Sequence, residues 1–479
     1  MEINQRMSKR FAWMLGVAML VSIGLLVACG SNYNASSDGL MLVGSQGSGL
    51  VETFSFNLGS GHVSAISNTP NDTSSLTCVL NGIPSSLVVD PAGAYAYTII
   101  NANSLCTTDP TKPSTTGILA FKVGSDGTTT QVGNLVLFNQ GIVTPCLPFL
   151  PPAKGCQPST STEQVPVLPS MMVMDPAGKF LFVADRATTD STGLFVPGAV
   201  SVFAIGSGGA ATEVAGSPFF TSNNPMTLPQ SGLDIVSVAP TPTVLPLVGI
   251  NGVRNAVCND LGNNPATLQY LYAVDGLGNQ LFEFSVDTTS GVLKNPATLG
   301  QQPFPTDQIP AGVAVDPCNR FVYVSDSLTN RVSAYAICNG STTSPAIPCA
   351  ALVPGALVEV AGSPFGLSGS ANSPGPLVVD AFGNYVYVVG TLSNTVSVLK
   401  ISPITGSLTA TAPATVATGV GPKAIAIRAD DSWMFVSNFG SSSLGGNTVT
   451  QYLVTPQSGA LTVQPPIQTD NYPWGVAVK

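Results

Sequence analysis

Few side chains in this sequence are suited to acid–base or metal chemistry. The 479 residues include one histidine, 16 Lys and Arg, and 25 Asp and Glu, so 9% of the chain is charged. One histidine excludes an HExxH motif and any multi-histidine zinc site within a single chain. The chain also contains no G-x-S-x-G elbow and no Walker-type phosphate loop. The histidine itself, His62, follows Ser60-Gly61 in a predicted outer turn, where we expect it to be exposed.

One group of residues mixes charge, amide and aromatic surface at the ends of predicted strands. We expect these residues to surround one opening, and they are the candidate ligand-binding residues: Asp185, Arg186, Asp326, Lys423, Asn438 and Trp474. No catalytic residue and no metal ligand is assigned. For the carboxylates and the amide, the alternative role is turn capping, in which the side chain accepts backbone N–H bonds. We predict turn capping for four further carboxylates that precede Pro or Ala: Asp90, Asp175, Asp316 and Asp380.

Composition favours an all-β protein. The chain has 49 Gly and 39 Pro, and such residues favour turns and are unfavourable inside helices. A hydrophobic content of 44% excludes a disordered chain. The net charge of -9 and the absence of a basic stripe argue against a nucleic-acid partner.

The amino-terminal segment has the features of an export signal. Arg6, Lys9 and Arg10 precede an uncharged apolar run from 11 to 28, which is the layout of a secretory signal. The run ends in Leu-Val-Ala followed by Cys29, which resembles a bacterial lipobox and implies lipidation of Cys29 after cleavage. An ordinary signal peptide or a single spanning helix is the alternative.

Three segments follow from this interpretation. We predict a lipoprotein signal peptide at 1–28, a lipidated linker at 29–39 and one domain at 40–479. The protein is then exported and anchored to the cell envelope. Gly30, rather than an aspartate, follows the cysteine, which by analogy favours the outer membrane.

Residues 40–479 contain a sevenfold repeat. Its most regular part is an apolar tetrad, usually preceded by a proline and followed by a tight turn, which predicts a buried strand. A second strand with aromatic residues two positions apart follows most tetrads, and two further strands complete the repeat. The tetrads begin at Leu87, Met172, Val236, Val313, Leu377, Ile425 and Val476. Seven units of four strands predict a seven-bladed β-propeller with antiparallel blades. A β-helix or a pair of sandwiches is the alternative.

The ends of the repeat predict how the ring closes. Residues 40–43 stand at a second-strand position, whereas the seventh tetrad, 476–479, ends the chain. We therefore expect the carboxyl-terminal strand to join the first blade as its innermost strand, which removes a free sheet edge. The longer insertions then enlarge one face, here called the top, which is where second strands end.

The eight cysteines after Cys29 divide evenly between the two faces. An even number in an exported protein favours disulfides, although sequence leaves three pairings per face. We predict Cys146–Cys156 and Cys78–Cys106 at the top, with Cys338–Cys349 and Cys258–Cys318 at the bottom. A metal cluster is the alternative, but the chain lacks CxxC spacing.

The repeat resembles the YVTN-repeat and lactonase-like propellers, the class that includes bacterial 6-phosphogluconolactonase. The clearest copy runs from Val315 to Asp326, VDPCNRFVYVSD. The resemblance implies lactonase activity, but members with that activity typically carry Gly-Pro-Arg-His before an inner strand. This chain has Gly421-Pro422-Lys423-Ala424 there. Lys423 keeps a positive charge, whereas Ala424 cannot transfer a proton.

Two functions remain open at this point. The first is a non-catalytic, lipid-anchored propeller whose top face binds a protein, a glycan or a small ligand. The second is a lactonase-like hydrolase acting on a sugar lactone. We expect a monomer that contacts the membrane through its lipid anchor and needs no cofactor. Ca²⁺ enters only under the lactonase alternative.

Overall fold

The structure is a computed structural model of the 479-residue chain. It describes residues 38–47, 49–66, 71–72, 83–101, 116–138, 141–142, 164–165, 168–189, 195–196, 198–221, 234–241, 269–294, 303–338, 355–367, 373–441 and 445–479. The proposed signal segment, Cys29, and six of the eight other cysteines lie outside the described residues. The described residues contain no helix that is long and apolar enough to cross a membrane.

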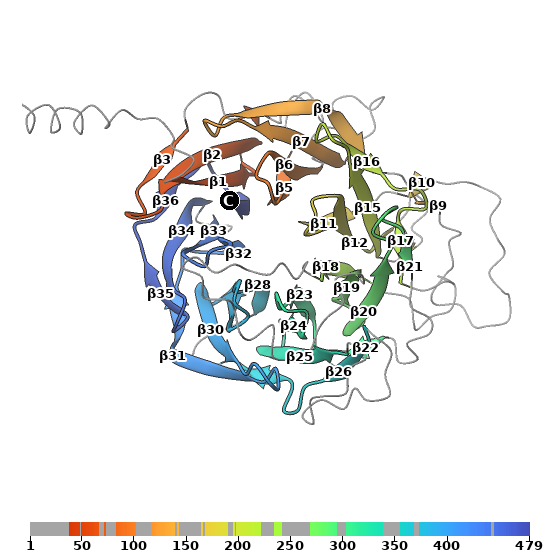
Figure 1. Ribbon diagram of the computed structural model, residues 1–479, viewed down its shortest axis with the longest axis vertical. Helices are drawn as coiled ribbons and strands as arrows, with labels where there is room; N and C mark the ends of the chain where they lie inside the picture. The colour runs from red at the N-terminus through yellow and green to blue at the C-terminus, as the bar shows by residue number, and fades with distance from the viewer. Residues whose placement is uncertain are drawn as a thin grey trace, which may run out of the picture.

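Seven antiparallel sheets stand in a ring around a common axis, as predicted (Figure 1). Each blade has four strands in chain order from the axis outwards, except that the first blade takes its inner strand from the end of the chain. Blade 1 consists of β37 (Pro473–Val478), β1 (Asp38–Ser45), β2 (Leu50–Asn57) and β3 (Val63–Ala65). Blade 2 consists of β5 (Ile83–Val89), β6 (Tyr95–Asn101), β7 (Gly117–Val123) and β8 (Thr129–Leu137).

The other five blades repeat this order. Blade 3 consists of β11 (Leu168–Met174), β12 (Phe180–Arg186), β15 (Ala199–Ile205) and β16 (Ala211–Glu213). Blade 4 consists of β18 (Ile235–Pro240), β19 (Gln269–Asp275), β20 (Gln280–Val286) and β21 (Leu293–Lys294). Blade 5 consists of β23 (Pro310–Val315), β24 (Phe321–Asp326), β25 (Arg331–Ile337) and β26 (Leu357–Glu359). Blade 6 consists of β28 (Pro374–Val379), β29 (Tyr385–Gly390), β30 (Thr395–Ile401) and β31 (Leu408–Ala417). Blade 7 consists of β32 (Pro422–Ile427), β33 (Trp433–Gly440), β34 (Gly445–Thr455) and β35 (Ala460–Val463).

Short strands supplement the blades. Five of them add a second piece of outer strand, paired with the third strand of a blade. These are β4 (Asn71–Asp72), β17 (Phe219–Phe220), β22 (Phe304–Pro305), β27 (Phe365–Gly366) and β36 (Ile467–Gln468). Two small hairpins, β9 (Gly141–Ile142) with β10 (Gln164–Val165) and β13 (Thr188–Thr189) with β14 (Phe195–Val196), complete the described strands. The sequence repeat did not predict this division of the outer strand.

The carboxyl-terminal strand closes the ring, as the repeat predicts. β37 pairs antiparallel with β1, with Met41 opposite Val478 and Val43 opposite Val476. The Lys479 N–H also donates to the Leu40 carbonyl over 2.8 Å. Blade 1 is therefore built from both ends of the described chain.

The hydrophobic core is divided among the seven contacts between neighbouring blades. One cluster of buried side chains lies at each contact, including the contact between blades 7 and 1, where Phe56, Trp433 and Phe435 meet. The alternating pattern of the strands produces this arrangement, because each strand sends side chains to both faces of its sheet. Both faces of every blade are covered by a neighbour, so no blade has a free face to bury elsewhere.

A glycine in the outer turn of each blade faces the second strand of the preceding blade. The glycine lies between the third and fourth strands, and the facing residue is in six of the seven cases the first aromatic residue of the repeat. The pairs are Gly127 with Leu40, Gly209 with Tyr95, Gly291 with Phe180, Gly355 with Tyr270, Gly406 with Phe321, Gly459 with Tyr385 and Gly61 with Trp433. This contact joins two separate elements of the sequence repeat, the turn glycine and the aromatic residue.

The four carboxylates assigned to turns do cap them. Asp90 accepts bonds from the N–H groups of Ala94 and Tyr95 at 2.6 and 2.7 Å. Asp175, Asp316 and Asp380 accept the equivalent pair of bonds in their own turns. These carboxylates fix the turn between the first and second strands.

Two of the eight cysteines fall within the described residues. Cys318 and Cys338 are buried, and both are disulfide-bonded. Their proposed partners, Cys258 and Cys349, lie outside the described residues, as do Cys78, Cys106, Cys146 and Cys156. The four pairings therefore stay predictions.

Candidate functional site

Every inner strand begins with the same irregularity at the top of the ring. Its first one or two residues pair with the end of the second strand, and the register then shifts by one or two residues, as between Pro422 and Ala424 in β32. The same shift occurs in the other six blades. Such a bulge takes one side chain out of the ladder and changes its direction. The unpaired residue of each inner strand is therefore the one whose side chain can leave the plane of the sheet at the top.

Most of these bulged residues are small, and Lys423 is the one charged residue among them. The bulges contain Ser85 and Ser86, Ser170, Val236, Ala311, Gly375 and Pro376, Lys423 and Trp474. Lys423 and Trp474 belong to blades 7 and 1, which are neighbours across the closure of the ring. Among the bulged residues, the cationic and aromatic side chains therefore lie in one sector, and we define the candidate site there.

The Lys423 cluster consists of Lys423, Phe439, Tyr472 and Trp474. The Lys423 ammonium lies 5.1 Å from the centre of the Trp474 ring and 5.8 Å from that of Phe439, within cation–π range. Phe439 stands edge-on to Trp474 with ring centres 5.2 Å apart, and Tyr472 lies at the same distance from Phe439. No carboxylate among the described residues forms an ion pair with Lys423. The cluster thus offers a positive charge beside aromatic faces.

Backbone bonds hold the aromatic members of the cluster in place. The Tyr472 N–H donates to the Gly446 carbonyl of β34, and its own carbonyl accepts from Gln46 just after β1. The Phe439 N–H donates to Gly421, directly before β32. Tyr472 has a left-handed backbone with a φ of 59°, which is uncommon for a bulky residue. The segment that enters β37 is therefore fixed to both blades that share the site.

Asp185, Asp326 and Asn438 form bonds within their own blades rather than with the Lys423 ammonium. All three are buried, and each bonds to the third strand of its own blade. Asp185 accepts the Ser201 hydroxyl at 2.6 Å, Asp326 accepts that of Ser333 at 2.8 Å. Asn438 donates to Thr448 and Thr450. The structure thus gives these three residues bonds that link neighbouring strands within a blade.

Burial also governs the ionisation of these two carboxyl groups. Desolvation raises the pKa of Asp326 to about 7 and holds the pKa of Asp185 well above its usual value. The bonds from Ser333 and Ser201 oppose the rise only partly. A raised pKa alone would suit an acid catalyst, but neither group touches the Lys423 cluster.

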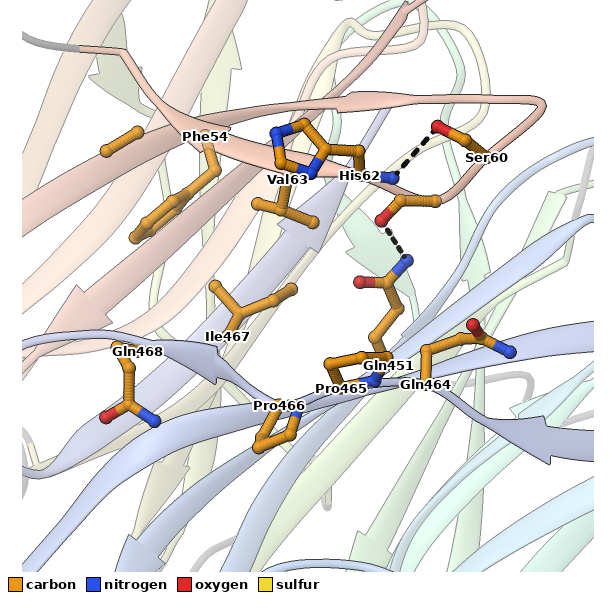
Figure 2. A pocket seen from close by; sticks show the side chains of 12 residues that line it. Phe54, Ser60, His62, Val63, Gln451, Gln464, Pro465, Pro466, Ile467 and Gln468 are labelled. Carbon is orange, nitrogen blue, oxygen red and sulfur yellow. Dashed lines mark hydrogen bonds between the residues drawn. The ribbon is translucent and has the colours of Figure 1, made fainter.

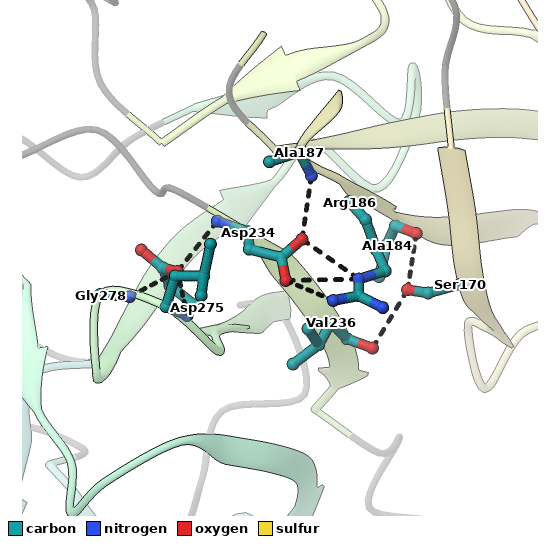
Figure 3. A network of polar contacts seen from close by, with 9 residues as sticks. Ser170, Ala184, Arg186, Ala187, Asp234, Val236, Asp275 and Gly278 are labelled. Carbon is teal, nitrogen blue, oxygen red and sulfur yellow. Dashed lines mark hydrogen bonds and ion pairs between the residues drawn. The ribbon is translucent and has the colours of Figure 1, made fainter. Parts of the chain in front are cut away.

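Arg186 takes part in a polar network between blades 3 and 4 (Figure 3). Its guanidinium donates to the Asp234 carboxylate at 2.7 Å, although half of the arginine side chain stays exposed. The Asp234 N–H in turn donates to Asp275, which also accepts the N–H groups of Leu277 and Gly278. Asp234 therefore neutralises Arg186, and the network joins two blades.

Of the six candidate residues, the structure brings Lys423 and Trp474 together, and sequence reasoning missed their aromatic neighbours. Phe439 follows Asn438 at the end of a strand, and Tyr472 precedes the last inner-strand proline. The repeat places both positions next to predicted strand ends at the top. An aromatic residue at either position was the sequence feature that could have added it to the candidate group. Among the described residues there is no cluster of three or more side chains suited to a metal ion.

Comparison with known proteins supports the propeller fold and the resemblance to lactonase-like proteins. Residues 371–478, which include blades 6 and 7 and the site, match the family model described as lactonase, 7-bladed beta-propeller. No curated protein sequence matches the chain.

Several solved structures share the propeller over nearly their whole length. One is a putative 6-phosphogluconolactonase from Bacteroides fragilis, with 17% identity, a TM-score of 0.59, and coverage of 93% of this chain and 99% of the other. Another is a periplasmic gluconolactonase from Pseudomonas aeruginosa, with 16% identity, a TM-score of 0.58, and coverage of 92% and 99%. A putative 6-phosphogluconolactonase from Bacteroides uniformis is similar at 15% identity, a TM-score of 0.57, and coverage of 92% and 100%. The chain therefore has the fold of these propellers, and the sequence resemblance to lactonase-like proteins is confirmed.

Proposed function

We propose that the protein is a lactonase-like hydrolase that binds a sugar lactone at the Lys423 cluster. The observation that carries this proposal is the Lys423 ammonium beside the Trp474 and Phe439 rings, without a carboxylate partner among the described residues. The match of residues 371–478 to the lactonase family supports it.

The chemistry of such a site follows from its two kinds of surface. Aromatic faces can contact the C–H face of a sugar ring, and an ammonium group can donate to the carbonyl oxygen of the lactone. Donation to that oxygen stabilises the negative charge that develops there when water attacks the carbonyl carbon. The ring C–O bond then breaks, and the product is the hydroxy acid. Because Ala424 has no proton to transfer, solvent must supply and remove the protons, and we expect slow turnover.

A second function is favoured by one specific observation. Ala424 stands where active relatives are expected to have histidine, and Asp185 and Asp326 are committed to bonds inside their blades. These facts favour a non-catalytic propeller that binds a carboxylated or carbonyl-containing sugar at the same cluster. Both proposals assign the ligand to Lys423 and differ only in turnover.

A panel of sugar lactones separates the two functions. Hydrolysis is followed by acid release for gluconolactone and 6-phosphogluconolactone, with and without Ca²⁺, and corrected for the spontaneous reaction. For a hydrolase, Lys423→Met should lower kcat/KM by about 10²-fold, the usual cost of one oxyanion donor. Lys400→Met, an exposed lysine on the third strand of blade 6, is the matched control and should leave turnover unchanged.

The alternative outcomes have distinct meanings. Saturable binding without turnover, lost in Lys423→Met, would replace the hydrolase with the binding protein. Turnover equal to the wild type in Lys423→Met would overturn both proposals, because each of them requires the ammonium group. Calorimetry with gluconate provides the binding measurement for the same variants.

We further propose that the protein is exported and anchored through lipid on Cys29, as the sequence at 11–29 suggests. The first described strand, β1, begins at Asp38 and runs toward the top, so a tether ahead of it would leave from the bottom. The Lys423 cluster would then face away from the membrane. Mass spectrometry of the mature protein tests this: an acylated Cys29 is expected, and an unmodified amino terminus or an uncleaved chain would contradict it.

A further inference from the structure

A second cleft lies on the outer part of the ring, between blades 1 and 7 (Figure 2). It has a volume of about 520 Å³, within the range of small-molecule sites. The β2–β3 turn of blade 1 forms one wall and carries His62. The outer segment of blade 7, with Pro466 and Ile467, forms the other wall. None of the residues that line it belongs to the Lys423 cluster.

The cleft is lined by polar groups and by apolar side chains. Its polar groups include the carboxamides of Gln451, Gln464 and Gln468 and the His62 imidazole, whereas Val63 and Ile467 contribute apolar surface. None of the described residues that line it is a carboxylate, a lysine or an arginine. A carboxamide both donates and accepts hydrogen bonds, which matches a hydroxyl group. A fully charged ligand would lose its hydration here without gaining an opposite charge.

Gln451 is the buried polar group at the inner end of the cleft. The side chain is 1% exposed, and its Nε2 donates to the Gly61 carbonyl of blade 1 over 3.0 Å. This bond fixes the orientation of the carboxamide. Its Oε1 accepts no hydrogen bond from the described residues, and Figure 2 shows it pointing into the cleft. The Oε1 of this fixed carboxamide is therefore placed to accept a hydrogen bond from a ligand hydroxyl.

The walls of the cleft are formed before any ligand arrives. The Asn57 carboxamide accepts bonds from the N–H groups of Gly59 and Ser60 at 3.1 and 2.9 Å, which fixes the β2–β3 turn. The Trp433 indole N–H donates to the Leu58 carbonyl over 3.1 Å and holds the same turn against blade 7. A ligand therefore meets a rigid site, and less binding energy is lost to ordering.

From these contacts we propose that the cleft binds a neutral saccharide. Hydroxyl groups of the sugar bond to the Gln451 Oε1 and to the outer carboxamides, while a C–H face lies on Ile467 and Pro466. This site goes beyond the proposed function, because it is separate from Lys423 and requires no lactone. A ligand there touches the first and the last blade, so it also strengthens the closure of the ring.

The single histidine makes the proposal directly measurable. His62 is the one histidine in the chain, so a carbon–proton correlation spectrum shows one imidazole Cε1–Hε1 signal, and that signal reports on the cleft. We would titrate the protein with cellobiose, maltose and N-acetylglucosamine, and in parallel with glucuronate and glucosamine. At least one neutral sugar should move the signal saturably at millimolar concentration and raise Tm. The charged sugars should bind about tenfold more weakly or not at all.

Substitutions of the glutamines test whether the sugar binds in the cleft. Gln451→Leu removes the buried carboxamide and should weaken binding about fivefold or more, since one hydrogen bond is lost. Because this side chain also joins the two blades, Gln468→Ala at the exposed edge provides a second variant, which should weaken binding without lowering Tm. Lys423→Met is the control and should leave the titration unchanged, whatever it does to lactone turnover.

Three results would overturn the proposal. The first is that no neutral sugar moves the His62 signal. The second is that charged and neutral sugars bind equally well. The third is that the affinity is unchanged in both glutamine variants. Failure of the lactone assays alone has no bearing on this site, because those assays report on Lys423. The two proposals are therefore tested independently.

Discussion

At the scale of single residues, Lys423 and Ala424 have opposite consequences for chemistry. Lys423 places a positive charge at the one aromatic sector of an otherwise small and uncharged set of bulged residues. Ala424 follows it without any group able to accept a proton. A single cation can orient a ligand and stabilise an oxyanion, but it cannot also act as a general base while protonated. These residues therefore suit recognition of a carbonyl or carboxylate, and hydrolysis at the cluster should be slow because neither residue can take up a proton.

Buried carboxyl groups illustrate why ionisation alone does not identify a site. Asp326 has a raised pKa, yet it accepts both the N–H and the hydroxyl of Ser333 at 3.0 and 2.8 Å. Asp185 bonds to Ser201 at the equivalent position of blade 3. Burial raises a pKa wherever a carboxyl group is taken from water, whether or not a substrate is near. Geometry separates Lys423, which stands beside partly exposed aromatic rings, from these structural groups.

At the scale of elements, the contact between an outer-turn glycine and the preceding blade explains the most regular part of the repeat. Gly406 has a φ of +75°, and a Cβ atom there would stand 2.4 Å from the Phe321 ring. The Tyr323 hydroxyl also donates to the Gly406 carbonyl at 3.1 Å. The turn thus needs glycine for two reasons, the left-handed backbone and the close approach of an aromatic ring.

Gly406→Ala should therefore lower the free energy of unfolding by about 2–4 kcal/mol, from strained backbone and overpacking together. Two controls separate the causes. Gly133 has a φ of +66° with nothing within 4 Å of a Cβ atom, so Gly133→Ala should show the backbone cost alone. Gly208 has neither feature, and Gly208→Ala should be close to neutral. Urea denaturation measures all three, and equal losses in Gly406→Ala and Gly133→Ala would show that the ring contact contributes nothing.

The sequence predicted the elements more completely than the site. Inner strands, turn caps at Asp90 and its equivalents, and closure by β37 all follow from a pattern that is repeated seven times. The direction of a side chain at the end of a strand does not, because one bulged residue reverses which side a residue faces. The sequence therefore placed Asp326 and Asn438 at strand ends, as the structure does. It could not show that their side chains are buried and bonded to the third strand of the blade. The cleft near His62 was missed because it joins residues about 400 positions apart.

At the scale of the whole molecule, the ring buries carboxyl groups in several blades at once. Burial raises the pKa of Glu283 to about 9, of Asp326 and Asp431 to about 7, and of Asp380 to about 6. These groups bind protons more tightly in the folded chain than in the unfolded chain. Folding is therefore coupled to proton uptake, and the free energy of unfolding falls as the pH rises through the folded pKa values. The exposed carboxylates of Asp126 and Asp287 have lowered pKa values. Their contribution to the free energy of unfolding rises with pH, but only in the acid range where they titrate.

We therefore expect the protein to be more stable at pH 5 than at pH 8, with a Tm higher by at least a few degrees. Asp431→Asn should raise the free energy of unfolding at pH 8, by on the order of 2 kcal/mol, because it removes a poorly solvated charge near Asp380. The amide can still accept the Ala381 N–H bond that the Asp431 carboxylate accepts at 2.8 Å. Asp287→Asn, in an exposed turn, should leave the slope between pH 6 and 8 unchanged. Thermal melts across this pH range measure both effects, and a stability that is flat or rises from pH 5 to pH 8 would show that these carboxyl groups are solvated in the folded ring.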